Sequence, residues 1–177
     1  MTAHNEYGYA LFLLAKEEGA LDATRNDAVI ANELLRENEG YVKLLDTPAL
    51  SKDEKTALID EAFGTLSYSV LNLLKILCEK RCVHSFAEVF DTYFSEYDRE
   101  MGIERVEAVT AVKMTEGQIA NLSKKLQSLT GKTVVIKNTV SPEILGGVKL
   151  RYSGIQIDGS VKSRLDAFSE NLKNIVI

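Results

Sequence analysis

The chain has 177 residues, of which 45% are hydrophobic and 27% charged, and its formal net charge at pH 7 is −5. This balance is typical of a soluble globular protein and excludes an intrinsically disordered or a fibrous class. A chain of this length folds as one ordinary domain or as two small ones.

The first predicted helix covers residues 5–19 and is unusually apolar. Between Tyr7 and Ala15 only Gly8 is neither apolar nor aromatic, so apolar surface extends nearly all round the helix. The run is too short to span a bilayer, and charged residues follow it in place of a cleavage site. No Arg-rich leader precedes it. We therefore expect a soluble, cytoplasmic protein without a signal peptide or transmembrane helix.

Capping and turn signals divide the rest of the first hundred residues into five further helices. Their predicted caps or first residues are Thr24, Gly40, Ser51, Ser67 and Ser85. Ala28, Ala31 and Leu35 form one apolar face behind Thr24, and Glu54 completes a capping box with Ser51. Because the connections are short, we expect an N-terminal six-helix antiparallel bundle over residues 1–103.

The pattern changes after Gly102. Val106, Ala108 and Thr110 alternate with Glu107 and Val109, a two-residue period that predicts a strand. A capping box at Thr115 begins a helix over residues 115–130, and residues 133–139 are a β-branched strand. Residues 104–177 are therefore expected to form a small α/β domain with a hairpin and two helices, and the predicted fold class is α+β.

The segment over residues 144–165 predicts the hairpin and the start of the closing helix. Val148, Leu150 and Tyr152 alternate with basic residues, a two-residue turn follows, and residues 155–158 alternate back as the antiparallel partner. Asp158-Gly159-Ser160 ends that strand, and Ser160 can cap a helix. The predicted buried stripe of this helix is Val161, Leu165, Phe168, Leu172 and Ile175.

This block resembles the C-terminal signature of the F-type ATP synthase delta subunit, whose mitochondrial counterpart is the oligomycin sensitivity conferral protein. The resemblance rests on the order Gly-Gly, hairpin, Ile-Asp-Gly-Ser-Val, basic residue, Arg-Leu. Its structural residues here would be Gly146, Gly147, Asp158, Gly159, Ser160 and Arg164. The opening residues 7–12, Tyr-Gly-Tyr-Ala-Leu-Phe, are similar to the family's Tyr-Ala-x-Ala-Leu-Phe, so the resemblance covers the whole chain.

Residues with metal or nucleophilic chemistry are few. Cys78 and Cys82 lie four apart in a helical pattern, with His84 nearby. A fourth zinc ligand is missing and the spacing matches no common zinc site, so packing is the favoured interpretation and no metal is expected. Nothing nearby would orient the imidazole for a Cys–His nucleophile.

Thr130-Gly131-Lys132-Thr133 resembles the end of a nucleotide-binding P-loop. The first glycine of that motif is replaced by Leu126, and a strand rather than a helix follows the lysine. Gly146-Gly147 enters a strand and lacks a dinucleotide fingerprint, which favours a hinge or close packing. The sequence predicts no cofactor and no catalytic residue. A small hydrolase whose active site is unrecognised stays a third alternative function, after the two described below.

Charge is distributed unevenly. Residues 1–102 carry 10 Lys and Arg against 19 Asp and Glu, whereas residues 103–177 carry 11 against 7. This asymmetry indicates either two surfaces with different partners or merely two solvated faces. A nucleic-acid-binding protein that uses the basic C-terminal domain is the main alternative function, although aromatics are scarce there.

Two helices are too apolar for the surface of a small bundle. Besides the first helix, the stretch over residues 70–78 is interrupted only by Asn72 and Lys75. Such helices are either central and fully surrounded or leave one face for a partner, and the pattern alone leaves both interpretations open.

The resemblance favours a partner. In that family the first and fifth helices grip the N-terminal helix of an alpha subunit, and the C-terminal domain is held by the b subunits of the peripheral stalk. Carried over, the alpha-facing groove would contain Tyr7, Leu11, Leu14 and Ile76. The resemblance thus implies a non-catalytic stator subunit of the proton-translocating ATP synthase, peripheral on the cytoplasmic side of the cell membrane, with neither nucleic-acid binding nor membrane insertion.

Overall fold

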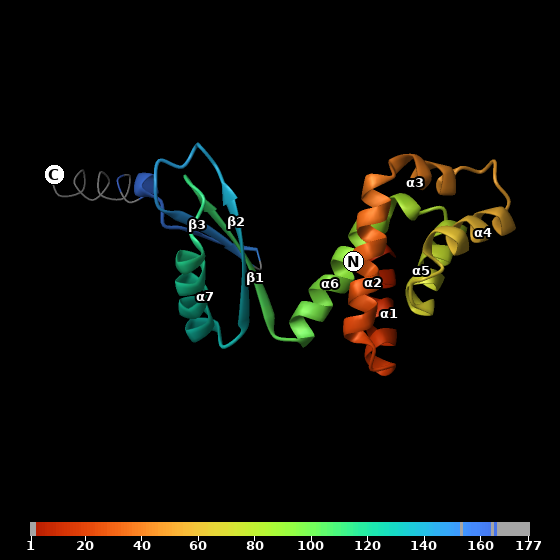
Figure 1. Ribbon diagram of the computed structural model, residues 1–177, viewed down its shortest axis with the longest axis horizontal. Coiled ribbons are helices and arrows are strands. Elements are labelled where there is room, and N and C mark those ends of the chain that lie inside the picture. The colour runs from red at the N-terminus through yellow and green to blue at the C-terminus, as the bar shows by residue number, and fades with distance from the viewer. Residues whose placement is uncertain (1–2, 153, 164, 166–177) are drawn as a thin grey trace. The chain divides into compact units, whose positions relative to one another are not determined.

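The chain divides into two compact units, Met1–Asp98 and Arg99–Ile177. A computed structural model of the chain describes residues 3–152, 154–163 and 165. The first unit is helical, and the second contains a mixed sheet and a helix (Figure 1). The fold class is therefore α+β, as predicted.

Helices follow one another closely through the first unit. They are α1 (Ala3–Glu17), α2 (Leu21–Glu37), α3 (Glu39–Asp46), α4 (Lys52–Phe63), α5 (Tyr68–Glu79), the short 3₁₀ helix η1 (Val83–Ser85) and α6 (Phe86–Glu100). The capping box that begins α4 is confirmed, because the Ser51 hydroxyl accepts from the Glu54 N–H while the Glu54 carboxylate accepts from the Ser51 N–H.

Of the predicted caps, Thr24 is in the wrong place, whereas Ser67 is at the N-cap of α5 but makes no capping hydrogen bond with its side chain. Thr24 is buried inside α2, which already begins at Leu21, and Ala28, Ala31 and Leu35 continue its buried face. The Ser67 hydroxyl makes no capping bond at α5 and is buried without a partner in the described part of the chain. Instead, the Ser67 N–H donates to the carboxylate of Asp27 at 2.8 Å, so a side chain from α2 caps α5.

The core of the helical unit brings side chains from most of its helices together. Its largest fully buried members include Leu35, Leu45, Ile59, Leu74, Leu77, Phe90 and Tyr93. The Tyr93 hydroxyl donates to the Leu21 carbonyl at 2.9 Å, which satisfies the one polar atom that this ring carries into the core.

In the second unit the described strands form one four-stranded sheet. The elements are β1 (Ile103–Thr110), α7 (Glu116–Thr130), β2 (Thr133–Val140), β3 (Val148–Tyr152) and β4 (Ile155–Asp158). The strand order is β2-β1-β3-β4, with β1 parallel to β2 across α7 and antiparallel to β3. The hairpin predicted for β3 and β4 is confirmed, with Tyr152 opposite Ile155.

Alternation along the strands gives the sheet two different faces. Val106, Ala108, Val134 and Leu150 form the buried core, against which Leu122 and Leu126 of α7 pack. The intervening residues of β1 and β2 therefore point to the opposite face, away from α7.

Only the start of the predicted closing helix is described. Residues 161–163 and 165 are helical, and the Ser163 N–H donates to the Ser160 hydroxyl at 3.2 Å, as expected of a cap. Val161 and Leu165, which were predicted to be buried, are 45% and 59% exposed, so the predicted buried stripe is wrong at these two positions. Arg164 and the other predicted buried positions, Phe168, Leu172 and Ile175, lie outside the described residues.

Candidate functional site

Helix α1 has one buried face and an exposed apolar remainder. Its buried side chains are Leu11, Phe12 and Ala15. Tyr9, Leu13 and Leu14 are each 41% exposed. The interpretation in which this helix is surrounded on all sides is therefore wrong for α1, and large apolar side chains of α1 reach the surface.

Gly8 sets the distance between α1 and α6. A Cβ at this position would lie 2.2 Å from the carbonyl oxygen of Val89 and 2.8 Å from the Cβ of Thr92. Because no methyl group can occupy that space, only glycine allows the two helices to pack this closely. The pattern that this segment resembles has alanine at the position of Gly8. Close packing against α6 explains why this chain has glycine there.

The other side of α1 meets α5. The Ser69 hydroxyl at the start of α5 donates to the Glu18 carboxylate just after the end of α1, at 3.2 Å, so the end of one helix lies beside the start of the other. Leu14 lies one turn before Glu18, and Ile76 lies two turns after Ser69. Leu14 and Ile76 therefore lie on the flanks of α1 and α5 that face this junction, and we call the pair the α1–α5 edge.

The four residues predicted for a groove have different exposures. Leu14 and Ile76 are 41% and 42% exposed, Tyr7 is half-buried, and Leu11 is only 4% exposed. Leu11 can therefore form the floor of a groove but offers little surface of its own. Leu14 and Ile76 offer most of the contact area among the four.

Leu13 lies on a different flank of α1 from Leu14. Consecutive helical residues are rotated by about 100°, and Tyr9, one turn before Leu13, lines a cavity together with Glu88 and Asp91 of α6. The equally exposed Leu13 therefore belongs to the α6 side of α1, away from the α1–α5 edge. The apolar run alone does not indicate that these two leucines lie on different flanks of α1.

The Gly-Gly and Asp-Gly-Ser segments pack directly against each other. The Gly159 N–H donates to the Val148 carbonyl, and the Val161 N–H donates to the Gly146 carbonyl, both at 3.0 Å. Gly147 has φ +85°, and a Cβ there would lie 2.5 Å from the Gly159 carbonyl oxygen. These residues form a tight backbone corner at the end of the hairpin, which supports the structural role expected of them.

Asp158 adds polar contacts to this corner. Its carboxylate accepts from the Ser160 N–H at 2.9 Å and pairs with Lys149 at 3.0 Å. Hydrogen bonds from the Ser160 hydroxyl and N–H, together with Lys149, lower the pKa of Asp158 to about 2. The carboxylate is therefore charged at neutral pH and holds the strand end to the start of the closing helix.

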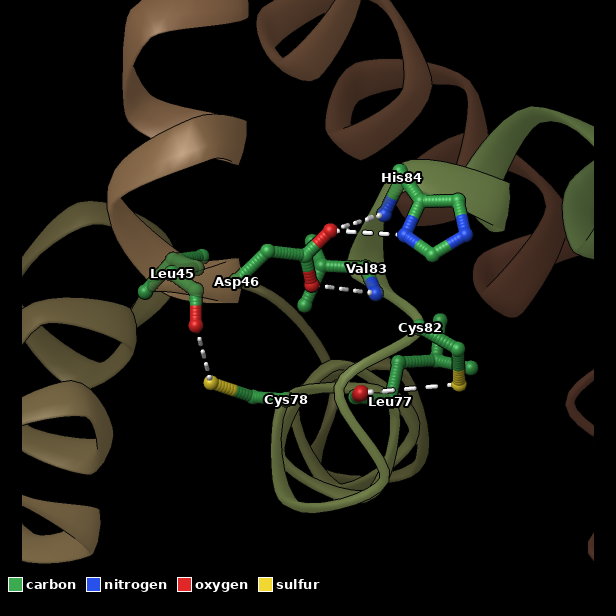
Figure 2. A network of polar contacts seen from close by, with 7 residues as sticks. All are labelled: Leu45, Asp46, Leu77, Cys78, Cys82, Val83 and His84. Carbon is green, nitrogen blue, oxygen red and sulfur yellow. Dashed lines mark hydrogen bonds and ion pairs between the residues drawn. The ribbon is translucent and has the colours of Figure 1, made fainter. Parts of the chain in front are cut away.

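The cysteines and His84 make separate structural contacts, as Figure 2 shows. The Cys78 thiol donates to the Leu45 carbonyl and the Cys82 thiol to the Leu77 carbonyl, each at 3.5 Å. Burial raises the pKa of both thiols, so the thiolate form that binds metals is disfavoured. In the described parts of the chain, His, Cys, Asp and Glu side chains form no group of three or more suited to a metal ion.

Asp46 at the end of α3 holds the turn that precedes α6 (Figure 2). Its carboxylate accepts from the N–H groups of Val83 and His84, at 3.0 and 3.1 Å, and lies 2.7 Å from the His84 Nδ1. These contacts satisfy backbone donors of η1, so the role of the imidazole here is structural.

The segment that resembles a P-loop ends a helix. Gly131 is the left-handed C-cap of α7, with φ +69°, and β2 begins at Thr133. Lys132 pairs with the buried Glu104 of β1 at 2.9 Å. The segment therefore lacks the helix N-terminus at which a P-loop binds phosphate.

The sheet face opposite α7 is a second candidate surface. Arg105, Glu107, Lys137 and Arg151 line an open cavity there together with the exposed side chain of Val135. Register places Glu107 between Lys137 and Arg151, and Arg151 pairs with Glu107 at 3.6 Å. Three cations against one carboxylate make this face basic.

Comparison with known proteins matches nearly the whole chain. The family described as ATP synthase delta (OSCP) subunit matches residues 3–172. The chain is 32% identical over 174 residues to an ATP synthase subunit delta of Clostridioides difficile, covering 97% of this chain and 96% of that protein. It is 30% identical over 169 residues to that of Lactobacillus johnsonii, covering 95% and 93%.

A solved structure shares the fold. A chain of the Toxoplasma gondii mitochondrial ATP synthase hexamer superposes with a TM-score of 0.76, at 22% identity over 97% of this chain and 98% of that one. Within the described residues, every helix is too short or too polar to cross a membrane.

Proposed function

This chain belongs to the ATP synthase delta (OSCP) subunit family, and from that membership we propose that it is a non-catalytic stator subunit of the F-type ATP synthase. In this role it links the alpha3beta3 catalytic head to the b subunits of the peripheral stalk. Residues 1–103, as a six-helix antiparallel bundle, bind the head, and residues 104–177 bind the stalk. The protein is peripheral, on the cytoplasmic side of the cell membrane.

The exposed α1–α5 edge is the observation that supports the proposed binding to the catalytic head. Leu14 and Ile76 leave two large apolar side chains in water on the flanks of α1 and α5 that face their junction, whereas Leu11 is buried. An amphipathic helix laid along this edge, in contact also with Tyr7, would bury them. Burial of apolar area contributes about 25 cal/mol per Å² before the costs of association. We propose the alpha subunit N-terminal helix as this partner.

The basic sheet face opposite α7 supports the stalk-binding part. Arg105, Lys137 and Arg151 line the same cavity as an exposed apolar side chain, Val135, which is a composition suited to an acidic amphipathic segment. The signature residues Gly146, Gly147, Asp158, Gly159 and Ser160 act by holding the hairpin and the closing helix in place.

This function is mechanical. A rotary motor transmits torque only if its catalytic head is prevented from turning with the rotor, so a stator link must stay bound under load. It needs binding surfaces but no reaction of its own. The matched family gives no support to the alternative of a nucleic-acid-binding protein.

Co-purification from native membranes tests the proposal. The tagged full-length chain should retain both the catalytic head and the b subunits after mild detergent extraction. The Ile76→Asp variant should lose the head while still retaining the b subunits, because the charge lies only at the α1–α5 edge. A tagged chain that retains neither, or that instead binds RNA with a steep salt dependence, would contradict the stator role.

A further inference from the structure

A small cavity of about 210 Å³ lies between α4 and α5, on the α4 side of α5. It is lined by Leu50, Lys52, Lys55, Thr56, Lys75, Cys78, Glu79 and Arg81. None of these residues belongs to the α1–α5 edge, so the cavity is separate from the surface proposed to bind the head.

The lining is strongly cationic in an acidic unit. Residues 1–102 carry 10 Lys and Arg against 19 Asp and Glu, yet four of those ten cations line this one cavity beside a single carboxylate, Glu79. Like charges repel one another when they are gathered in a partly desolvated space. Four cations gathered in one cavity of a unit whose net charge is negative therefore indicate that an anion binds between them.

Two of the lysines already have partners. Lys52 pairs with Glu79 at 3.0 Å, and Lys75 pairs with Asp60 at 2.6 Å. Each of these pairs joins α4 to α5, and both lysines are among the residues that line the cavity.

Lys55 has no such partner. It is only 7% exposed, and among the described residues its ammonium group makes neither an ion pair nor a hydrogen bond. Desolvation raises the pKa of the Cys78 thiol and the nearby charge of Lys55 opposes that effect, which is consistent with the ammonium lying beside Cys78 in the cavity. Within the described part of the chain, the buried stem of Lys55 thus leaves a positive charge without a counter-ion at the cavity, where an anion would neutralise it.

Arg81 approaches the same cavity from the segment after α5. Its backbone has φ 54°, an uncommon conformation for a residue other than glycine, and its N–H donates to the Cys78 carbonyl at 3.1 Å. This turn ends α5 and directs the chain so that Arg81 lines the cavity. Within the part of the chain that the structure describes, its guanidinium has no acidic partner.

We propose that this cavity binds a doubly charged oxyanion of the phosphate class, held by Lys55 and Arg81. A cavity of this volume is below the roughly 300–1,000 Å³ of pockets for drug-sized ligands, and it suits a small oxyanion or the terminal phosphate of a larger molecule. Arginine and lysine together are the side chains that bind phosphate oxygens best, through charge-assisted hydrogen bonds. The bound anion would bridge α4 to the end of α5 and stabilise their packing.

Calorimetric titration of the purified full-length chain with inorganic phosphate tests this site, at constant ionic strength set with chloride. A parallel titration with ATP shows whether the cavity prefers free phosphate or the phosphate tail of a nucleotide, because the preferred ligand has the lower dissociation constant. Saturable one-to-one binding is expected in at least one titration. Absence of saturable binding in both would overturn the proposal.

Three variants decide where the anion binds. Lys55→Met and Arg81→Gln should each weaken binding about tenfold or more, because each removes a charge-assisted hydrogen bond. Lys80→Met removes the same charge from an exposed neighbouring position outside the cavity and should change the affinity less than about twofold. Equal losses of affinity in Lys55→Met and Lys80→Met would overturn the proposed site. If Lys55→Met does not fold, unchanged affinity in Arg81→Gln would overturn it equally. This inference does not depend on the stator role.

Discussion

Replacing Gly147 by alanine should destabilise the C-terminal unit by about 2–5 kcal/mol, worked out from two separate effects. With φ +85°, an L-residue at this position is strained by about 1–2 kcal/mol. The added Cβ would also lie 2.5 Å from the Gly159 carbonyl oxygen and 2.8 Å from the Cα of Ser160. Forcing the two backbone segments apart costs about 1–3 kcal/mol more.

Gly154→Ala is the matched control. This turn residue has nearly the same backbone conformation, φ +79°, but a Cβ there would meet no atom within 4 Å. Gly154→Ala should therefore lower the unfolding free energy only by the backbone strain, about 1–2 kcal/mol. Amide hydrogen exchange of β1 and β3 measures the unfolding free energy of this unit in the full chain. Equal losses in the two variants would refute the conclusion that the Gly-Gly and Asp-Gly-Ser segments are locked by close packing.

Two further predictions concern other contacts of the chain. Gly8→Ala should destabilise the helical unit by at least about 1–3 kcal/mol in urea unfolding, because its methyl group would overlap the Val89 carbonyl of α6. Gly40→Ala, in α3 with open space around it, should instead stabilise the unit by about 0.5–1 kcal/mol, and a loss in both would argue against the close α1–α6 packing. Because the folded-state pKa of Asp158 is about 2, below its ordinary 3.8, its contribution to stability is complete above about pH 4 and is lost as the pH falls toward 2. Asp158→Asn should flatten the decline of C-terminal stability in that interval, and an unchanged acid-unfolding curve would contradict this.

Features set by neighbours in the sequence could be predicted well. The capping boxes at Ser51 and Thr115 involve residues three apart, and the turn between β3 and β4 involves two, so their physical causes are visible in the sequence. The exclusion of a P-loop at Gly131 was also local, because it rested on Leu126 in place of the first glycine of the motif and on the strand that follows Lys132.

Contacts between distant residues could not be predicted in this way. Asp27 caps α5 through the Ser67 N–H, forty residues away, and no local pattern in the sequence indicates that contact. The burial of Lys55 was missed for the same reason, since its stretch of charged residues is typical of a solvated helix start. The difference between Leu13 and Leu14 depends on which helix lies beside each flank of α1, which only the tertiary structure provides.

The central claim is that the α1–α5 edge binds a partner helix, and a calorimetric titration with a peptide of the alpha subunit N-terminal helix tests it most directly. Leu14→Asp and Leu13→Asp introduce the same charge at adjacent positions with equal exposure, 41% each. Leu14→Asp should weaken binding at least about tenfold, because the carboxylate would be buried without a partner, whereas Leu13→Asp should change the affinity less than about twofold. Equal effects of the two substitutions, or no binding by the unaltered chain, would contradict the account.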